Sequence, residues 1–323
     1  MKPAFSRISP VNINGHSTNR LMIVLKTKGC EYALNNNGGC SVCGFTNNAI
    51  PNISEKQIIS QLTYALKKHD LQQVEEIDLL TLGSFFNDNE ISSALRRNLL
   101  EIIAELDFIK RVSFESRAEY ITTEKLLECR KILSNKIVEL GIGLESADNY
   151  IRNSIINKNL SEEDFYNVMV KLKETGYDLL VYLLIKPPSL TEKQAIDDAI
   201  KSVKYVFEKA SKINLKVRYA LEPVFICGNT KLEDLYLNSK YKPANLWSIL
   251  EVIKNVKQYG EIFVGMSDES LSLGRMTFSC DKCYDNMINE IENFNKTNNL
   301  NGIKALECDC KMEYQKQLEK GLI

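Results

Sequence analysis

The sequence predicts an α/β fold, a partial (β/α)6 barrel followed by a small cysteine-rich C-terminal extension. Short apolar runs alternate with segments of helical periodicity along most of the 323 residues. Polar or glycine-rich motifs follow six of these runs at regular intervals. Such alternation is typical of a parallel sheet buried on both faces, where the carboxyl ends of the strands carry the chemistry. We therefore expect the six motifs to meet at one end of an open barrel.

The predicted strands are the apolar runs. They lie at 21–25, 76–82, 111–116, 137–144, 179–185, 216–221 and, with a weaker pattern, 262–265. One helix is expected after Ser54, and further helical segments lie near 89–106, 122–133, 161–175 and 192–208. Ser54, Ser161 and Thr191 precede three of these segments and are expected to cap them.

The two ends of the chain differ from its middle. Residues 1–20 are polar, include Pro3 and Pro10, and are expected to form an irregular N-terminal arm. Residues 21–235 carry the barrel pattern, and residues 236–323 form the extension. This gives three predicted regions.

Composition restricts the class of protein. A hydrophobic content of 44% is enough for one large core, and 41 basic against 42 acidic residues give no overall basic field for nucleic acid. Nine clustered cysteines without a signal-peptide pattern indicate a reducing, cytoplasmic location and metal binding. No run approaches the roughly 20 apolar residues of a membrane span. Hydrolase motifs are absent as well.

Three cysteines lie in a loop rich in Gly and Asn after the first predicted strand. Cys30, Cys40 and Cys43 have the spacing C-x9-C-x2-C, which lets three thiolates converge on one metal centre. A closed zinc site or an electron-transfer cluster takes four protein ligands. A 4Fe-4S cluster with three cysteine ligands keeps one iron free for S-adenosylmethionine (SAM), whose one-electron cleavage yields a 5'-deoxyadenosyl radical. The alternative is a zinc site completed by His16 or a distant cysteine.

The other strand ends carry side chains suited to a polar ligand. Gly83 permits close approach of a ligand to the backbone, and groups at Gly83 and Ser84 can accept from an ammonium. Glu115 or Glu145 suits a ribose diol or an amino group, and Arg117 suits a carboxylate. Taken singly, each is also compatible with a solvated turn.

Four further cysteines lie near the C-terminus. Cys280, Cys283, Cys308 and Cys310 supply four thiolates, the number of a structural zinc site, which we favour because a short tail needs a metal to fold. A second iron–sulfur cluster is the alternative. The single Trp, Trp247, has apolar neighbours at helical spacing and is expected in the core rather than as a substrate platform.

With these motifs in view, the chain resembles the radical SAM superfamily, and within it the archaeosine-synthesis radical SAM proteins (RaSEA), relatives of the Elongator catalytic subunit. The resemblance extends from about residue 26 to residue 310. The motifs that show the resemblance are the cysteine loop, Gly83-Ser84-Phe85, the motifs at 115–119 and 143–146, Lys186-Pro187-Pro188, Leu246-Trp247-Ser248 and the terminal cysteine pairs.

The resemblance implies a radical SAM barrel and a tRNA-modifying activity. Cys30, Cys40 and Cys43 would bind the 4Fe-4S cluster, and SAM would be bound by the five strand-end residues Gly83, Ser84, Glu115, Arg117 and Glu145. The implied reaction cleaves a lysine-bearing deazaguanine in tRNA to give archaeosine. It requires a partner protein that attaches the lysine and a reducing electron donor.

Lys186 and Glu222 are the candidate catalytic residues, with Trp247 as a further candidate substrate contact. Two alternatives stay open. One is a radical SAM enzyme acting on a peptide or small metabolite, which the balanced charge favours. The other is a non-catalytic, zinc-stabilised module that binds RNA or protein.

Overall fold

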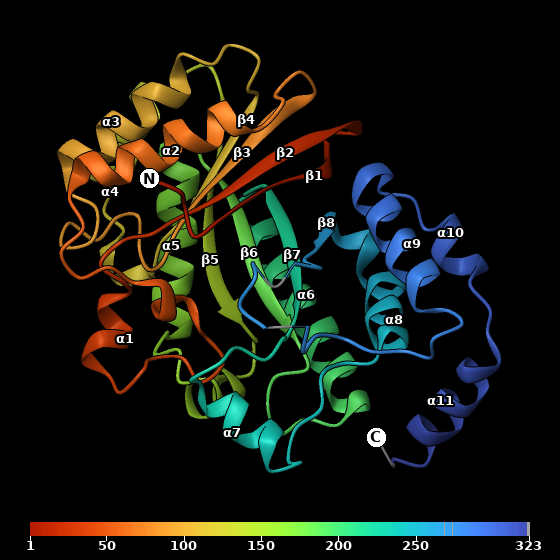
Figure 1. Cartoon of the computed structure of the whole chain (residues 1–323). Helices are drawn as coiled ribbons and strands as arrows, with labels where there is room; N and C mark the ends of the chain where they lie inside the picture. Colours follow the sequence, from red (N-terminus) through yellow and green to blue (C-terminus); the bar gives the residue numbers. More distant parts are fainter. Residues whose placement is uncertain (268, 273, 322–323) are drawn as a thin grey trace.

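The computed structural model describes residues 1–267, 269–272 and 274–321. Its eight strands form one sheet in chain order, with β1 antiparallel to β2 and all later pairs parallel. The strands are β1 (Phe5–Ile13), β2 (His16–Leu25), β3 (Val74–Thr81), β4 (Arg111–Glu115), β5 (Ile137–Glu145), β6 (Asp178–Ile185), β7 (Val217–Pro223) and β8 (Glu261–Val264). Among the described residues the edge strands β1 and β8 share no ladder, so the sheet is a nearly closed barrel (Figure 1). The predicted α/β partial barrel is confirmed.

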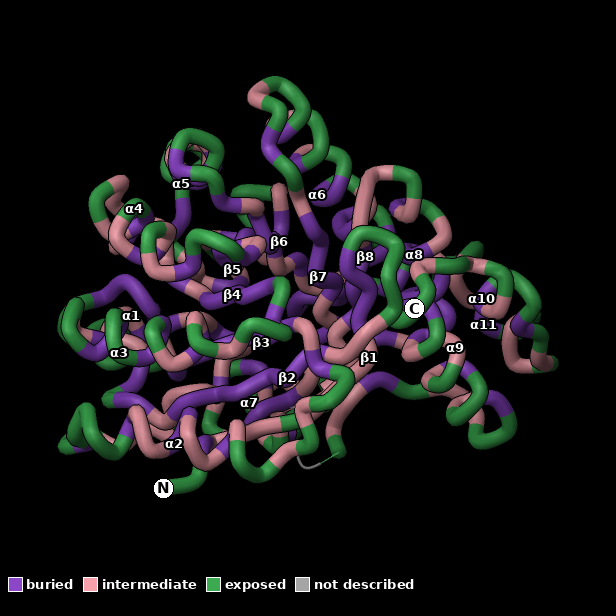
Figure 2. Tube along the Cα trace, turned by 90° about the horizontal axis from the view of Figure 1, so that it is seen from above, coloured by how far each residue is buried: buried purple, intermediate pink, exposed green. Residues whose placement is uncertain are grey.

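Helices surround the sheet on its outer side (Figure 2). They are α2 (Glu55–Lys68), α3 (Ser93–Ala104), α4 (Thr123–Ile132), α5 (Glu162–Thr175), α6 (Glu192–Lys212), α8 (Leu246–Val256) and α9 (Tyr284–Thr297). The caps predicted at Ser54, Ser161 and Thr191 are confirmed, because each side chain accepts a hydrogen bond from a backbone N–H in the first helical turn. Among the described residues, no helix is long and apolar enough to cross a membrane.

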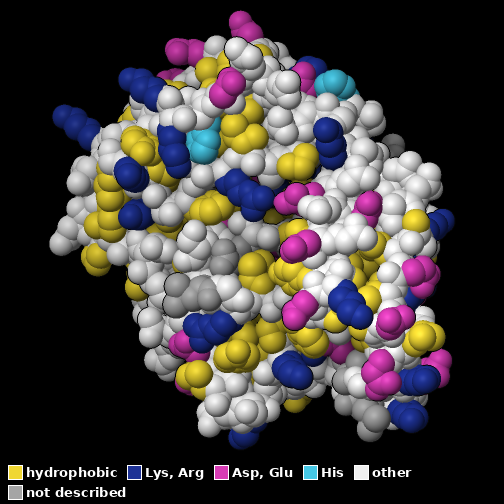
Figure 3. Space-filling view, turned by 45° about the vertical axis from the view of Figure 1, so that its right-hand side comes forward, with side chains coloured by type: hydrophobic (Ala, Val, Ile, Leu, Met, Phe, Trp, Pro, Cys, Tyr) yellow, Lys and Arg dark blue, Asp and Glu magenta, His cyan; other side chains and the backbone are white. Residues whose placement is uncertain are grey.

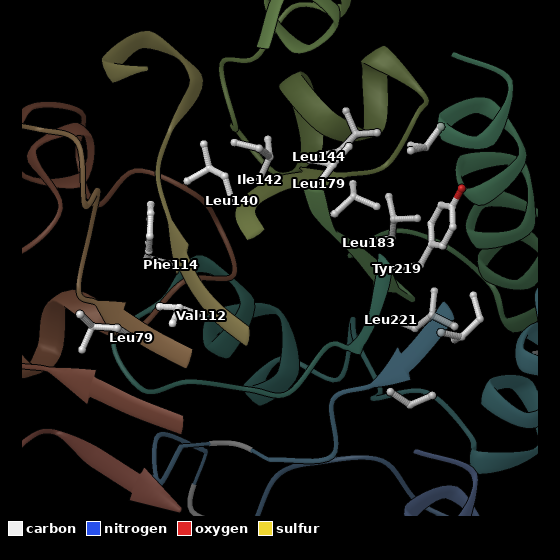
Figure 4. Packing of buried hydrophobic residues seen from close by; sticks show 14 of the residues in the cluster. Leu79, Val112, Phe114, Leu140, Ile142, Leu144, Leu179, Leu183, Tyr219 and Leu221 are labelled. Carbon is white, nitrogen blue, oxygen red and sulfur yellow. The ribbon is translucent and has the colours of Figure 1, made fainter. Parts of the chain in front are cut away.

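The hydrophobic core lies between the sheet and these helices. Side chains alternate between the two faces of each strand, and every second residue of β3 to β7 is an apolar side chain that points outward. Figure 4 shows this layer, in which Phe114 lies near Leu140 and Leu183 lies near Tyr219. Burying one such side chain contributes about 1.5–3 kcal/mol, so this layer holds the helices on the barrel.

The inner face of the barrel is charged, which the sequence analysis did not predict. Arg111 pairs with Glu76 at 3.2 Å and with Glu261 at 2.9 Å. Arg218 pairs with Glu76 at 2.8 Å and also with Glu139. Both arginines are fully or almost fully buried, so each desolvated charge has to be offset by these partners.

The expectation that residues 1–20 are irregular is wrong. The segment forms β1 and the start of β2, joined by Asn14 and Gly15 with φ of 51° and 88°. Two left-handed residues in an Asn-Gly pair make the tight turn whose twist matches a β-hairpin. Pro10 is tolerated because β1 is an edge strand, where a missing N–H donor costs little.

Helix α9 covers the gap between the two edge strands. It packs against β1, β2 and β8. The Asn295 side chain of α9 donates to the Val264 carbonyl at 2.9 Å and accepts from the Val264 N–H at 2.9 Å. Because β8 belongs to the sheet, the boundary predicted at residue 235 does not coincide with the edge of the barrel.

Replacing Arg218 with Met should lower the free energy of unfolding by about 3–5 kcal/mol, because it leaves buried carboxylates without their cation. Chemical denaturation measures the change. The matched control is Arg97→Met, since Arg97 pairs with Glu128 at 2.6 Å while 56% exposed, and should cost no more than about 1 kcal/mol. Equal losses in the two variants would contradict a compensating role for the buried network.

Candidate functional site

A cavity of about 270 Å³ opens at the carboxyl ends of the strands. Its walls are formed by the ends of β2 to β8 and by the loops that follow them, as the strand-end motifs predicted. Cys30, Cys40 and Cys43 all line it. The short helices α1 (Glu31–Asn35) and α7 (Lys231–Leu237) lie at this end of the barrel (Figure 1).

The cysteine loop is folded back on itself by a left-handed turn. Asn37, Gly38 and Gly39 have φ of 48°, 90° and 71°. A Cβ on Gly39 would lie 2.8 Å from the Ala33 Cα, so only glycine lets the returning chain approach α1 this closely. This turn brings Cys40 to the cavity that Cys30 already lines.

The donor set of the loop fits a metal cluster. Burial raises the pKa of the Cys30, Cys40 and Cys43 thiols, so a cationic centre is needed to hold them as thiolates. The three loop sulfurs do not all lie within 4.8 Å of one another. Among the described residues, only the four C-terminal cysteines bring their sulfurs this close together. The loop is therefore better suited to a polynuclear cluster than to a single ion.

The alternative zinc site completed by His16 is wrong. His16 begins β2, whereas the cysteine loop follows its last residue, Leu25, roughly 30 Å away along the strand. The His16 ring lies 3.3 Å from Glu75 at the other end of the barrel.

Glu90, which sequence reasoning missed, ties the cysteine loop to the strand ends. Its buried carboxylate accepts from the backbone N–H of Ser84 at 2.6 Å and of Glu31 at 2.9 Å, and from the Asn87 amide at 3.1 Å. Gly83 makes room for it, because a Cβ there would lie 2.0 Å from a Glu90 oxygen. Glu31 follows Cys30, so Glu90 fixes that cysteine relative to Gly83 and Ser84.

Two cations lie on the side of the cavity next to the cysteine loop. The Arg117 guanidinium stacks 3.9 Å from the Tyr32 ring centroid and donates to the Lys158 carbonyl at 2.9 Å. The Lys158 ammonium pairs with Glu145 at 2.6 Å. Arg117 and Glu145 were predicted here; Lys158 was not, although its two left-handed Asn neighbours mark a structured turn.

Two buried carboxyl groups, Glu115 and Glu222, extend into the cavity from β4 and β7. Glu115 is hydrogen-bonded to the Tyr182 hydroxyl, and burial raises the pKa of Glu115 to about 7. Burial also raises the pKa of Glu222 to about 8. Gly141 leaves space for the first pair, since a Cβ there would lie 2.8 Å from both side chains. The cavity thus holds two ion-paired cations, Arg117 with Glu119 and Lys158 with Glu145, together with these two buried carboxyl groups.

Three predicted site residues lie elsewhere. Ser84 is buried behind Gly83 and does not line the cavity, and Lys186 is buried with its ammonium 2.5 Å from Glu192. Trp247 is in the core, as expected, and its indole N–H lies 3.3 Å from the Cys310 sulfur. The structure therefore brings Glu222 to the cavity but not Lys186 or Trp247.

The four C-terminal cysteines form a separate centre. Their sulfurs are 3.3 Å apart for Cys280 and Cys283, 3.6 Å for Cys280 and Cys308, and 3.6 Å for Cys283 and Cys310. Four sulfurs at about 2.3 Å from one tetrahedral ion would be about 3.8 Å apart. These thiols are thus positioned for one ion.

Charge on the outside is mixed. Basic and acidic side chains both occur across the face seen in Figure 3, so no field of one sign covers it.

The cavity of this barrel is lined by the three loop cysteines and by Cys227. The comparisons with known proteins agree with the barrel fold. No family model matches the chain. The uncharacterized protein MJ0550 of Methanocaldococcus jannaschii is 33% identical over 93% of this chain and 82% of its own. Proteins named archaeosine synthase subunit beta are 29% identical in Methanosarcina acetivorans (98% of this chain, 90% of the relative) and 28% identical in Thermococcus kodakarensis (97% and 95%).

Solved structures share the fold. Elp3 of Methanocaldococcus infernus, lacking its N-terminus, matches with a TM-score of 0.53 and 16% identity over 94% of this chain. The chain spans only 63% of that Elp3 chain. Methylornithine synthase (PylB) matches with a TM-score of 0.51 and 14% identity over 91% of this chain and 85% of its own. The chain belongs to the family that contains MJ0550 and shares its barrel fold with the two solved structures.

Replacing Glu90 with Gln should loosen the cysteine loop, because one amide oxygen cannot satisfy the donors that the carboxylate accepts from. After anaerobic reconstitution with iron and sulfide, we expect a chelator to remove iron at least about threefold faster than from the wild type. Absorbance in the visible range follows the loss. Exposed Glu101→Gln serves as control, and identical rates in both variants would contradict the role of Glu90.

Proposed function

We propose that this protein is a radical SAM enzyme that converts a lysine-modified deazaguanine in tRNA to archaeosine. One observation carries the proposal. Relatives named archaeosine synthase subunit beta align over nearly the whole chain, and the aligned chain includes the three-cysteine loop that lines the cavity. The reaction would cleave a C–N bond of the lysine adduct and leave the amidine, as a lyase does.

In this proposal different cavity residues bind the cluster and SAM. Cys30, Cys40 and Cys43 would hold a 4Fe-4S cluster, which together with SAM supplies hydrogen-atom abstraction from the substrate through reductive cleavage of the sulfonium. The backbone at Gly83 would accept from the SAM ammonium. Arg117 lies beside the cysteine loop, where it would bind the SAM carboxylate.

The remaining residues would orient and support these groups. Glu115 would accept from the SAM ribose, and Tyr182 would hold its carboxyl group in place. Glu145 is paired with Lys158, so it would act in a neutralised pair rather than as a free charge. Ser84 supports the site from behind, since its hydroxyl accepts from the Arg117 N–H at 3.2 Å. Lys186 is paired with Glu192 and would position the end of β6.

Two macromolecular partners and a reductant follow from the same proposal. The relatives' name denotes one subunit of a synthase, so a second protein would supply the lysine-bearing tRNA.

The four C-terminal cysteines would hold structural zinc rather than a second cluster, given their spacing.

Cys30→Ala should abolish the cluster, because two cysteines do not hold it, and with it the formation of 5'-deoxyadenosine from SAM and dithionite. Iron content should fall from about four atoms per chain to near zero. Cys129→Ala is the control, since Cys129 is buried in α4 away from the cavity. A Cys30→Ala protein that still cleaves SAM would refute the assignment.

Metal analysis tests the C-terminal centre. We expect about one zinc per chain, lost in Cys283→Ser together with about 2 kcal/mol or more of stability, because a bound structural metal contributes directly to folding. About eight irons per wild-type chain after reconstitution would instead assign these cysteines to a second cluster.

The salt dependence of tRNA binding tests the class of substrate. Binding of tRNA, measured by filter retention, should weaken steeply as salt is raised, because phosphate contacts release counterions. Affinity for tRNA that does not respond to salt would favour the second candidate, a peptide or small metabolite, which the balanced charge supports.

A further inference from the structure

Glu222 differs from the other acidic side chains of the cavity. It extends from β7 into the cavity, and among the described residues no group donates a hydrogen bond to its carboxylate or forms an ion pair with it. Gly265, just after β8, leaves the space that the carboxylate occupies, since a Cβ there would lie 1.8 Å from its Oε2. The chain therefore keeps room for this carboxylate, and the residues that the structure describes supply it no partner.

The neighbouring charged groups are already engaged. Glu145 is paired with Lys158 at 2.6 Å, and Glu115 is hydrogen-bonded to Tyr182. Arg20 is the cation whose charge acts most strongly on Glu222, but its guanidinium binds Asp78 at 2.6 Å and stacks 3.9 Å from the Phe263 ring centroid. Burial raises the pKa of Glu222 to about 8, so its carboxyl group is largely protonated near neutral pH and would ionise when a cation is held against it.

We propose that Glu222 is the substrate-recognition residue that binds a cationic group, a primary ammonium or amidinium, inside the cavity. Glu115 and Tyr182 would form the facing wall. The inference rests on the proposed function, in which the substrate side chain carries an amine and the product carries an amidine. Desolvation of Glu222, which raises its pKa, would be offset by a cation held against it, and a charged hydrogen bond in a dry site discriminates strongly against neutral analogues.

SAM also carries a cationic ammonium, so the experiment separates the two sources. Glu222→Gln keeps the shape of the side chain and removes its charge, and exposed Glu101→Gln is the matched control. The KM for SAM is measured in Glu222→Gln and in Glu101→Gln from the substrate-free formation of 5'-deoxyadenosine, and similar values in the two variants would support the proposal. A KM for SAM raised about tenfold would place the SAM ammonium at Glu222 and overturn the proposal.

The substrate side is tested with two small probes that differ by one amine. Nα-acetyl-L-lysine methylamide and Nα-acetyl-L-norleucine methylamide are bound to the reconstituted protein with SAM, and affinities are measured by equilibrium dialysis. Wild type and Glu101→Gln should prefer the lysine probe by about tenfold, and Glu222→Gln should lose the preference. Equal affinity of the wild type for both probes, or a preference retained in Glu222→Gln, would overturn the proposal.

These outcomes are independent of the proposed reaction. If reconstituted protein cleaves SAM but makes no archaeosine from lysine-modified tRNA, the proposed substrate fails, yet the probe preference still reports on Glu222. If archaeosine forms and Glu222→Gln keeps the wild-type probe preference, the proposed function stands and this inference fails.

Discussion

The buried ion pairs inside the barrel are the constraint on which the rest of the structure depends. Arg111 and Arg218 lie between Glu76, Glu139 and Glu261, and each charge is compensated only in the observed strand register. A slip of one residue would turn these charges outward into the apolar layer under the helices. The network also fills the amino-terminal half of the barrel, so the cavity lies at the carboxyl ends.

The same alternation continues toward the carboxyl ends, with a different balance of charge. Glu115 follows the inward series of β4 that begins at Arg111, and Glu222 follows that of β7 from Arg218. Near the amino ends the carboxylates of Glu76, Glu139 and Glu261 have arginine partners, whereas among the described residues Glu222 has none. The unpaired carboxyl group therefore lies where a ligand would meet it, at a stability cost that functional sites commonly carry.

The sequence predicts those features of the fold and the site that depend on residues close together in the chain. Strand alternation, helix caps and the spacing of Cys30, Cys40 and Cys43 are local patterns, and all three appear in the structure. The hairpin at Asn14-Gly15 was also a local signal, but the polar composition around it hid it. Glu90 was missed because its contact with the cysteine loop, at the Glu31 N–H, spans 59 residues. Lys158 was missed because its partner Glu145 lies 13 residues away on a strand end. The partner of Lys186, by contrast, is the nearby Glu192, a pairing that the strand-end motif did not reveal.

The C-terminal cysteines connect their metal centre to closure of the barrel. Cys283 immediately precedes α9, and α9 covers the gap between β1 and β8. Cys308 precedes α11 (Asp309–Glu319), and the Cys310 sulfur lies 3.3 Å from the indole nitrogen of Trp247 on α8. One ion at these sulfurs would join α8, α9 and α11 at a single point. Strand β8 is short, and its outer edge forms no ladder with β1 among the described residues. Helix α9, held by the metal centre, contacts both strands and closes the barrel in place of that ladder.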